Sequence, residues 1–174
     1  MRLTYCFFLK IGFQISSLGE LKDIIPHAEK KLASIMSSSA TKILLADRKN
    51  GHWLHYTLSG EVQRSALNSG LAGMVLKYGK HECVNNAYAH QQFNGQVDLE
   101  TSMPLIIWPM KGPHDESEVI GVIEVINVKG IEGLATTNQA KLSTYDIEAI
   151  EFFSNQLARV IYDKLPKAKE TKEV

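Results

Sequence analysis

The segment 118–129 reads EVIGVIEVINVK and constrains the fold more than any other part of the chain. Its β-branched side chains favour a pleated surface over a helix. The nearly continuous hydrophobic character predicts a strand that is covered on both faces. Glu124 is the exception, because a buried carboxylate must be paired, hydrogen-bonded or protonated. We therefore expect Glu124 either to face a pocket or to lie on a face open to water.

Composition narrows the class of protein. The chain has 174 residues, and 19 basic residues balance 19 acidic ones. This balance gives no excess of positive charge that would indicate binding to nucleic acid or to an anionic membrane. No stretch reaches the ~20 apolar residues that a membrane-spanning helix needs, and the N-terminus lacks the pattern of a secretory signal. Cys6 and Cys83 have no metal or redox spacing and suit a reducing compartment, so we expect a cytoplasmic protein.

Helix signals stand near both ends of the sequence. Ser17 and Glu20 have the spacing of a capping box, and Pro26 is expected to kink or restart the helix that follows. Ser143 and Asp146 repeat the capping signal before the last helix. Residues 3–15 alternate apolar and polar side chains, which indicates either a strand or a leader.

Strand signals occupy the middle of the chain. Asn50 and Gly51 mark a hairpin between strands at 42–46 and 53–58. A short helix at 71–78 ends at Gly79, and a short strand at 81–84 follows. The polar connection 85–101 leads to strands at 104–110 and 118–128; a connection of this length is usually functional.

The order of elements predicts an α/β fold of the α+β type, with a central, mostly antiparallel sheet flanked by helices. We divide the chain into an extension at 1–16, one domain at 17–165, and a charged, disordered tail at 166–174.

Several motifs, in this order and spacing, resemble a GAF domain of the kind found in cyclic-nucleotide phosphodiesterases and adenylyl cyclases. They are SGLAGMV at 69–75, NAYAH at 86–90, FN at 93–94 with VD at 97–98, WPM at 108–110, and VIGVIEVIN at 119–127. The resemblance implies a regulatory sensing or dimerisation module of a signalling protein, and not an enzyme. It implies no metal or cofactor, with cyclic AMP or cyclic GMP as the ligand.

The family's binding mode assigns candidate ligand contacts to this chain. The base would lie between the sheet and the polar connection, and the phosphate would bind the amides at the start of the short helix. The matching positions are Tyr56, Leu71, Ala72, Asn94, Asp98, Thr101 and Glu124. On local grounds, Asp98 and Thr101 are also turn and capping residues.

The chain departs from the family's signature. Val128 follows Asn127 where the family has lysine, and Leu142 and Ile147 replace phenylalanine and glutamate. The alternative function is therefore a GAF fold used for protein–protein assembly, with a degenerate pocket and no nucleotide binding. A sulfoxide reductase of this fold would need more cysteines than Cys83 near its site.

The last helix carries more apolar residues than one small sheet would cover. We expect its outer face to pair with a second copy or another protein, because exposed apolar surface is costly. The candidate interface residues are Phe152, Phe153, Leu157, Val160 and Ile161. Residues 3–15, folded back over the helix, are the competing explanation.

Overall fold

The computed structural model describes residues 19–126 and 142–166. Its core is a six-stranded sheet in the order β3-β2-β1-β6-β5-β4, and every neighbouring pair is antiparallel. The strands are β1 (Thr41–Asp47), β2 (His52–Tyr56), β3 (Val62–Ala66), β4 (Glu82–Val84), β5 (Leu105–Lys111) and β6 (Val119–Ile126). The expected fold class is confirmed.

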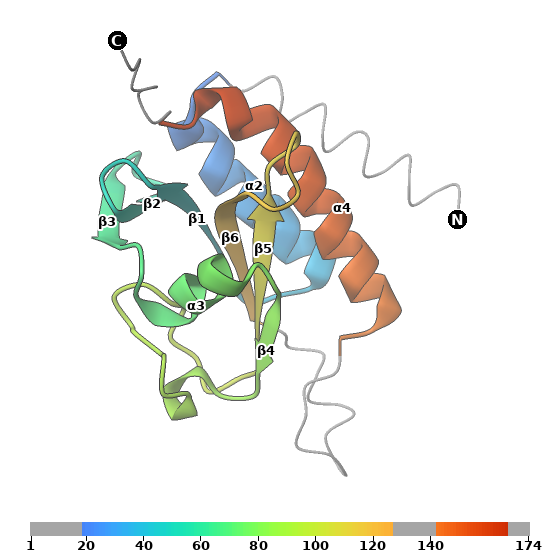
Figure 1. The fold of residues 1–174 in the computed structure, drawn as a ribbon. Helices are drawn as coiled ribbons and strands as arrows, with labels where there is room; N and C mark the ends of the chain where they lie inside the picture. Colours follow the sequence, from blue (N-terminus) through green and yellow to red (C-terminus); the bar gives the residue numbers. More distant parts are fainter. Residues whose placement is uncertain (1–18, 127–141, 167–174) are drawn as a thin grey trace.

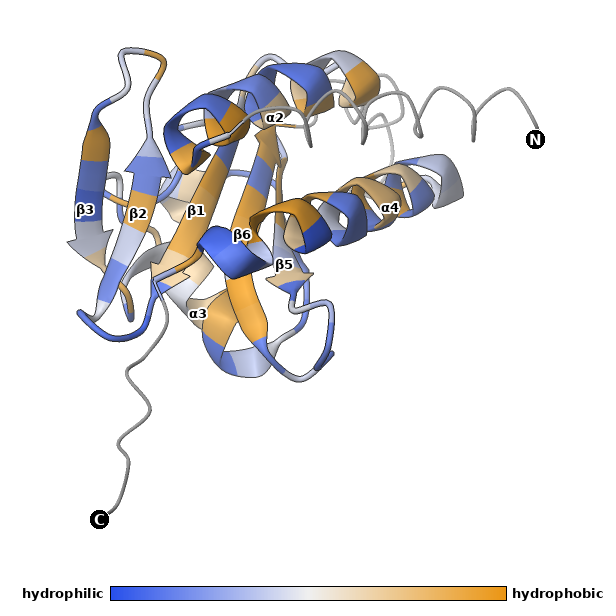
Figure 2. Ribbon diagram, turned by 90° about the horizontal axis from the view of Figure 1, so that it is seen from above, coloured by the Kyte–Doolittle hydropathy of each residue, from blue (hydrophilic) through white to orange (hydrophobic). Residues whose placement is uncertain are grey.

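Helices cover the two faces of this sheet unequally. The long helices α2 (Leu21–Met36) and α4 (Thr144–Ile161) lie side by side on one face, and α4 continues into the 3-10 turn η3 (Tyr162–Lys164). The short helix α3 (Gly70–Tyr78) lies on the opposite face with the connection 85–104, which contains the 3-10 turn η1 (Ala87–Ala89) (Figures 1 and 2).

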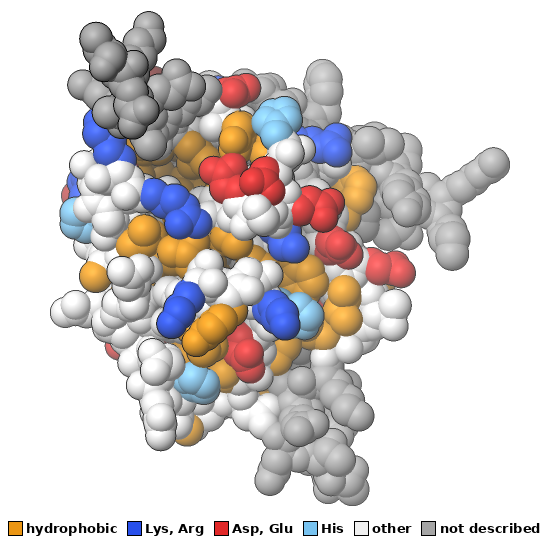
Figure 3. Space-filling model, in the orientation of Figure 1, with side chains coloured by type: hydrophobic (Ala, Val, Ile, Leu, Met, Phe, Trp, Pro, Cys, Tyr) orange, Lys and Arg blue, Asp and Glu red, His pale blue; other side chains and the backbone are white. Residues whose placement is uncertain are grey.

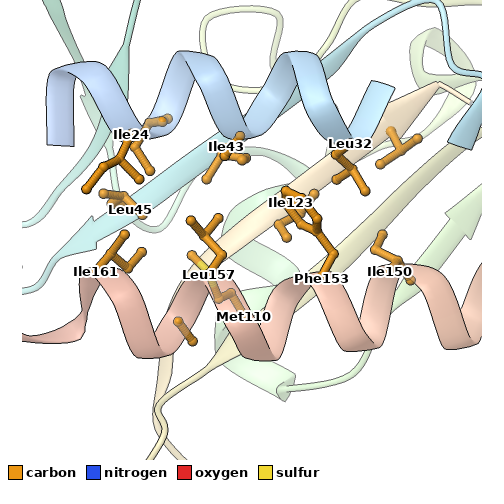
Figure 4. Close-up of a cluster of buried hydrophobic side chains, with 14 of the residues drawn as sticks. Ile24, Leu32, Ile43, Leu45, Met110, Ile123, Ile150, Phe153, Leu157 and Ile161 are labelled. Atoms are coloured by element: carbon orange, nitrogen blue, oxygen red, sulfur yellow. The ribbon is translucent and has the colours of Figure 1, made fainter. Parts of the chain in front are cut away.

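The face under α2 and α4 is an apolar core. Side chains from α2, β1, β5, β6 and α4 point toward one another in this layer (Figure 4). The fully covered ones include Ile24, Leu32, Ile43, Ile123, Ile150 and Ile161. Along β6, Ile123 and Val125 point into this layer, whereas Val122 and Glu124 point to the opposite face.

The face under α3 has a second core cluster. Leu44, Trp53, Leu71, Val75, Val122 and Ile107 are all buried there. Unlike the first layer, this side also holds buried carboxylates, since Asp98 is 2% exposed and Glu124 is 0% exposed. The polar connection therefore closes over ionisable groups, and this is the face that carries the candidate site.

Most predicted elements are present, with local differences. The four predicted strands around the two hairpins lie in one sheet as far as residue 126, and α3 ends at Gly79 as expected. Helix α2 begins at Leu21 with Glu20 as its N-cap, so Glu20 is not the third helical residue of a capping box. The helix also runs through Pro26 without restarting, because one lost hydrogen bond in the second turn is offset by burial of this side chain.

The apolar stripe of α4 faces the interior. Among the candidate interface residues, Phe153, Leu157 and Ile161 are 3% exposed or less within the single chain. Phe152 and Val160 are partly buried against the same core. Helices α2 and α4 therefore bury most of the apolar stripe for which we expected an external partner. The competing explanation, residues 3–15 folded back over the helix, concerns residues outside the described part of the chain.

Candidate functional site

The first turn of α3 is held by a carboxylate from the connection. Asp98 accepts hydrogen bonds from the backbone N–H groups of Leu71 (2.9 Å) and Ala72 (3.1 Å). Amides in the first turn of a helix have no acceptor within the helix, and they lie at the positive end of the helix dipole, so an anion is favoured here. Asp98 therefore occupies the position at which the family resemblance places a nucleotide phosphate.

Gly70 permits this close approach. Its φ of +79° is a left-handed conformation that glycine adopts without steric cost, and an added Cβ would lie 2.5 Å from Asp98 Oδ1. The carboxylate thus packs directly against the backbone at the start of the helix. Ser69, the N-cap residue, makes no capping bond of its own and instead accepts a hydrogen bond from the Asn94 side chain at 2.7 Å.

The connection is ordered by its own polar groups. The Asn94 N–H donates to Asp98 Oδ2 (2.9 Å), and the Asn94 carbonyl accepts from the amides of Val97 and Asp98. Thr101 Oγ1 accepts from Met103 N–H (2.9 Å), while the Thr101 carbonyl accepts from Ala87 N–H. Asn94, Asp98 and Thr101 thus act as turn and capping residues in this structure.

Glu124 lies on β6 beneath the connection. Its Oε2 accepts from Leu99 N–H at 2.7 Å, whereas Oε1 has no hydrogen-bond partner among the described residues when the carboxyl is ionised. Complete burial, followed by the negative charge of Asp98, raises the pKa of Glu124 well above its usual range. Protonation would turn this acceptor-only group into a donor, and Asp98 is the neighbouring acceptor. The exposed alternative for Glu124 is wrong, because the connection covers this face of the strand.

The predicted ligand contacts fall into two places. Six of them, Leu71, Ala72, Asn94, Asp98, Thr101 and Glu124, belong to α3, the connection and the β6 face beneath them. Tyr56 is separated from this group, since it packs against the core on the α2 and α4 side of the sheet.

Sequence reasoning missed two side chains that belong to the site. Lys42 stands opposite Glu124 in the register of β1 and β6, and its Nζ donates to the carbonyl of Val97 at 2.5 Å. The Ser69 hydroxyl anchors the Asn94 side chain. A lysine at the start of the apolar strand predicted at 42–46 was the available signal for Lys42.

An open groove of about 490 Å³ lies elsewhere, between the end of α3, the β5–β6 hairpin and α4. His81 and Trp108 stack along it with their ring centroids 4.7 Å apart, and Lys80, Glu151 and Arg159 also line it. The face that carries α3 and the connection mixes acidic and basic side chains with apolar ones (Figure 3). Within the described ranges there is no cluster of three His, Cys, Asp or Glu residues able to hold a metal ion. No helix in these ranges is long and apolar enough to cross a bilayer.

No protein-family model and no curated protein matches this sequence. Solved structures do resemble the fold. The GAF domain of an Acinetobacter phosphoenolpyruvate-protein phosphotransferase superposes with a TM-score of 0.72 and 19% identity, over 97% of this chain and 99% of that one. The GAF domain of the Coxiella burnetii phosphoenolpyruvate-protein phosphotransferase gives 0.66 at 15% identity, over 90% and 93% of the two chains.

An enzyme shares the architecture as well. Free methionine-R-sulfoxide reductase from Neisseria meningitidis, in complex with its substrate, superposes with a TM-score of 0.64 and 13% identity, over 89% of this chain and 86% of that one. None of these three structures comes from a cyclic-nucleotide enzyme. The antiparallel sheet, the helices on its two faces and these superpositions agree on one conclusion: the chain has the GAF fold.

Proposed function

We propose that this chain is a non-catalytic regulatory domain that acts by assembling with a second copy of itself, and that its own connection closes the ligand side. The observation that carries this proposal is the carboxylate of Asp98 on the amides of Leu71 and Ala72. A cyclic nucleotide would need the same amides for its phosphate. It would also meet a second buried carboxyl group, Glu124, beside the first.

A catalytic role is disfavoured by the chemistry of Cys83, the cysteine that lies in the described part of the chain. Burial, followed by the charge of Glu82, raises the pKa of the Cys83 thiol to about 11, so the nucleophilic thiolate is scarce near neutral pH. Cys83 also packs against the core on the α2 and α4 side, whereas Glu124 faces the connection on the other side of the sheet. The thiol and the buried carboxyl pair therefore do not share a site.

The regulatory role is supported by the similar structures. Two of the similar structures are GAF domains of phosphoenolpyruvate-protein phosphotransferases, and another is named as a putative GAF sensor protein. Helix α4 offers the surface for assembly. Tyr145 is 50% exposed, and Phe152 stands seven residues later, on the same side of the helix.

A second candidate function, small-molecule sensing, is favoured by two buried polar atoms. Glu124 Oε1 and Trp53 Nε1 have no hydrogen-bond partner among the described residues, and both residues lie on the α3 side of the sheet. Buried polar groups without partners are uncommon in native proteins, and a bound molecule is one way to satisfy them. A ligand would have to displace part of the connection to reach them.

Light scattering and calorimetry on the full chain test the two functions together. We expect a concentration-dependent dimer that is weakened in a Tyr145→Ser, Phe152→Ser double variant. Tyr78→Ser is the matched control, because Tyr78 is exposed on α3, on the opposite side of the sheet. Titration with millimolar cyclic AMP or cyclic GMP should release no binding heat.

Two outcomes would contradict this proposal. A protein that stays monomeric at high concentration would remove the assembly role. Micromolar binding of either nucleotide, which corresponds to about −8 kcal/mol, would establish the sensing function instead.

A further inference from the structure

Residues 97–99 form a strap that is fastened to the rest of the domain at every residue. The carbonyl of Val97 accepts from Lys42 Nζ on β1. The side chain of Asp98 binds the first amides of α3, and Leu99 N–H donates to Glu124 on β6. Three consecutive residues thus join α3 to the centre of the sheet.

The middle of this arrangement is a pair of carboxyl groups shielded from water. Asp98 accepts from three backbone amides on its two oxygens, which leaves one of about four lone-pair sites for a further donor. Glu124 receives one amide on Oε2, and among the described residues its Oε1 has no hydrogen-bond partner, so a proton on this carboxyl would supply the missing donor. Two ionised carboxylates would repel each other beneath the strap, because both are buried and the charge of Asp98 acts on Glu124.

Among the described residues, the charged side chains that act on Glu124 are Asp98 and Lys42. Lys42, on the neighbouring strand β1, is the cation that favours ionised Glu124. On the other neighbouring strand, β5, the residue opposite Glu124 is Ile107, which is apolar and 0% exposed. Helix α3 contributes only backbone amides to Asp98. A single proton therefore decides whether Asp98 and Glu124 attract or repel each other.

We propose that Glu124 and Asp98 share one proton that latches the strap onto the sheet, and that loss of this proton loosens the strap and uncovers the start of α3. The latch is a pH-responsive element within the domain, and it does not depend on the proposed assembly role. No other molecule is required for it.

The direction of the pH response follows from linkage. The pKa of Glu124 is raised in the folded protein by burial and by the charge of Asp98. The native state therefore keeps a proton that the unfolded chain has already released. The stability that this proton adds is therefore fully present below the ordinary carboxyl range and is lost as the pH rises through the folded-state pKa of Glu124.

Amide exchange measured by NMR on the full chain tests the latch. After correction for the intrinsic exchange rate, protection of Leu99 N–H should fall as the pH rises above the ordinary carboxyl range, by up to tenfold per pH unit where Glu124 ionises. The amides of Leu71 and Ala72 should lose protection in the same interval. The Ile147 amide, which bonds to the Ser143 carbonyl in α4, is the internal control and should not respond.

The matched variant is Glu124→Gln, in which a neutral amide can accept from Leu99 N–H and donate to Asp98 at every pH. We expect Leu99 protection in this variant to be independent of pH. A pH-independent Leu99 in the unmodified protein, or an equal fall in the variant, would overturn the proposal. Should the variant not fold, the ¹³C titration of the Glu124 carboxyl in the unmodified chain decides, because ionisation in the ordinary carboxyl range would also overturn it.

Discussion

Helices α4 and α3 both start after a serine in extended conformation, yet they are capped in different ways. In α4, Ser143 Oγ accepts from Asp146 N–H at 3.1 Å, and Asp146 Oδ2 accepts from Ser143 N–H at 3.3 Å. In α3, Ser69 makes no capping bond, and the amides of Leu71 and Ala72 bind Asp98, which is 27 and 26 residues away in the chain.

The contrast separates local stability from coupling between distant parts of the domain. A cap closed within three residues stabilises its own helix whatever the rest of the chain does. A cap supplied by the connection makes the start of α3 depend on the position of the strap. The charge of Asp98 also acts on Glu124, so the proposed latch makes the long-range cap sensitive to a proton.

The largest effect should come from removing the long-range cap. Asp98→Ala leaves three backbone amides without their acceptor, and we expect the free energy of unfolding to fall by about 2–4 kcal/mol. Urea denaturation at constant pH measures this loss. Asp115→Ala is the control, because Asp115 accepts hydrogen bonds from Ser117 in an exposed loop and should change stability by about 0.5 kcal/mol or less. Equal losses in the two variants would refute the special role of Asp98.

Gly70→Ala should lower the free energy of unfolding by less than Asp98→Ala does, and it tests the same contact between Asp98 and the start of α3. Gly70 and Gly51 both have positive φ, at +79° and +71°, so alanine is strained at either position. Only at Gly70 would the new Cβ meet Asp98, while Gly51 has nothing within 4 Å. We expect about 1–2 kcal/mol of destabilisation for Gly51→Ala and about 1 kcal/mol more for Gly70→Ala, measured by the same denaturation series.

A double variant makes this comparison independent of backbone strain. In the Asp98→Ala background the clash is gone, so Gly70→Ala should cost no more than Gly51→Ala. An excess cost that persists without the Asp98 carboxylate would show that another neighbour causes it.

Local signals explain why much of the fold was predictable. Ser143 and Asp146 form the predicted capping box, and the β-branched run at 118–126 forms the inner strand β6. Strand β3 was missed because its sequence, VQRSA, is mostly polar at an exposed edge and carries no apolar alternation.

The candidate site depends on contacts that no local pattern encodes. Alternation places Glu124 on one face of β6, but only the connection folding over that face buries it. Asp98 reads as an ordinary turn residue, and its role as the cap of α3 depends on Gly70 allowing the approach. Tyr56 was assigned by its position in the family pattern, and the register of β2 points it toward the other core.

The smallest effect should come from the local cap. Ser143→Ala removes the hydroxyl that accepts from Asp146 N–H, and we expect a loss of about 1 kcal/mol in the free energy of unfolding. Thr144→Ala is the control, since Thr144 is exposed inside the first turn and is not the cap. Amide exchange then distinguishes the two kinds of cap. Ser143→Ala should raise the exchange of Asp146 and leave Leu71 and Leu99 unchanged, whereas loosening at Leu71 would show that α4 and the strap are coupled.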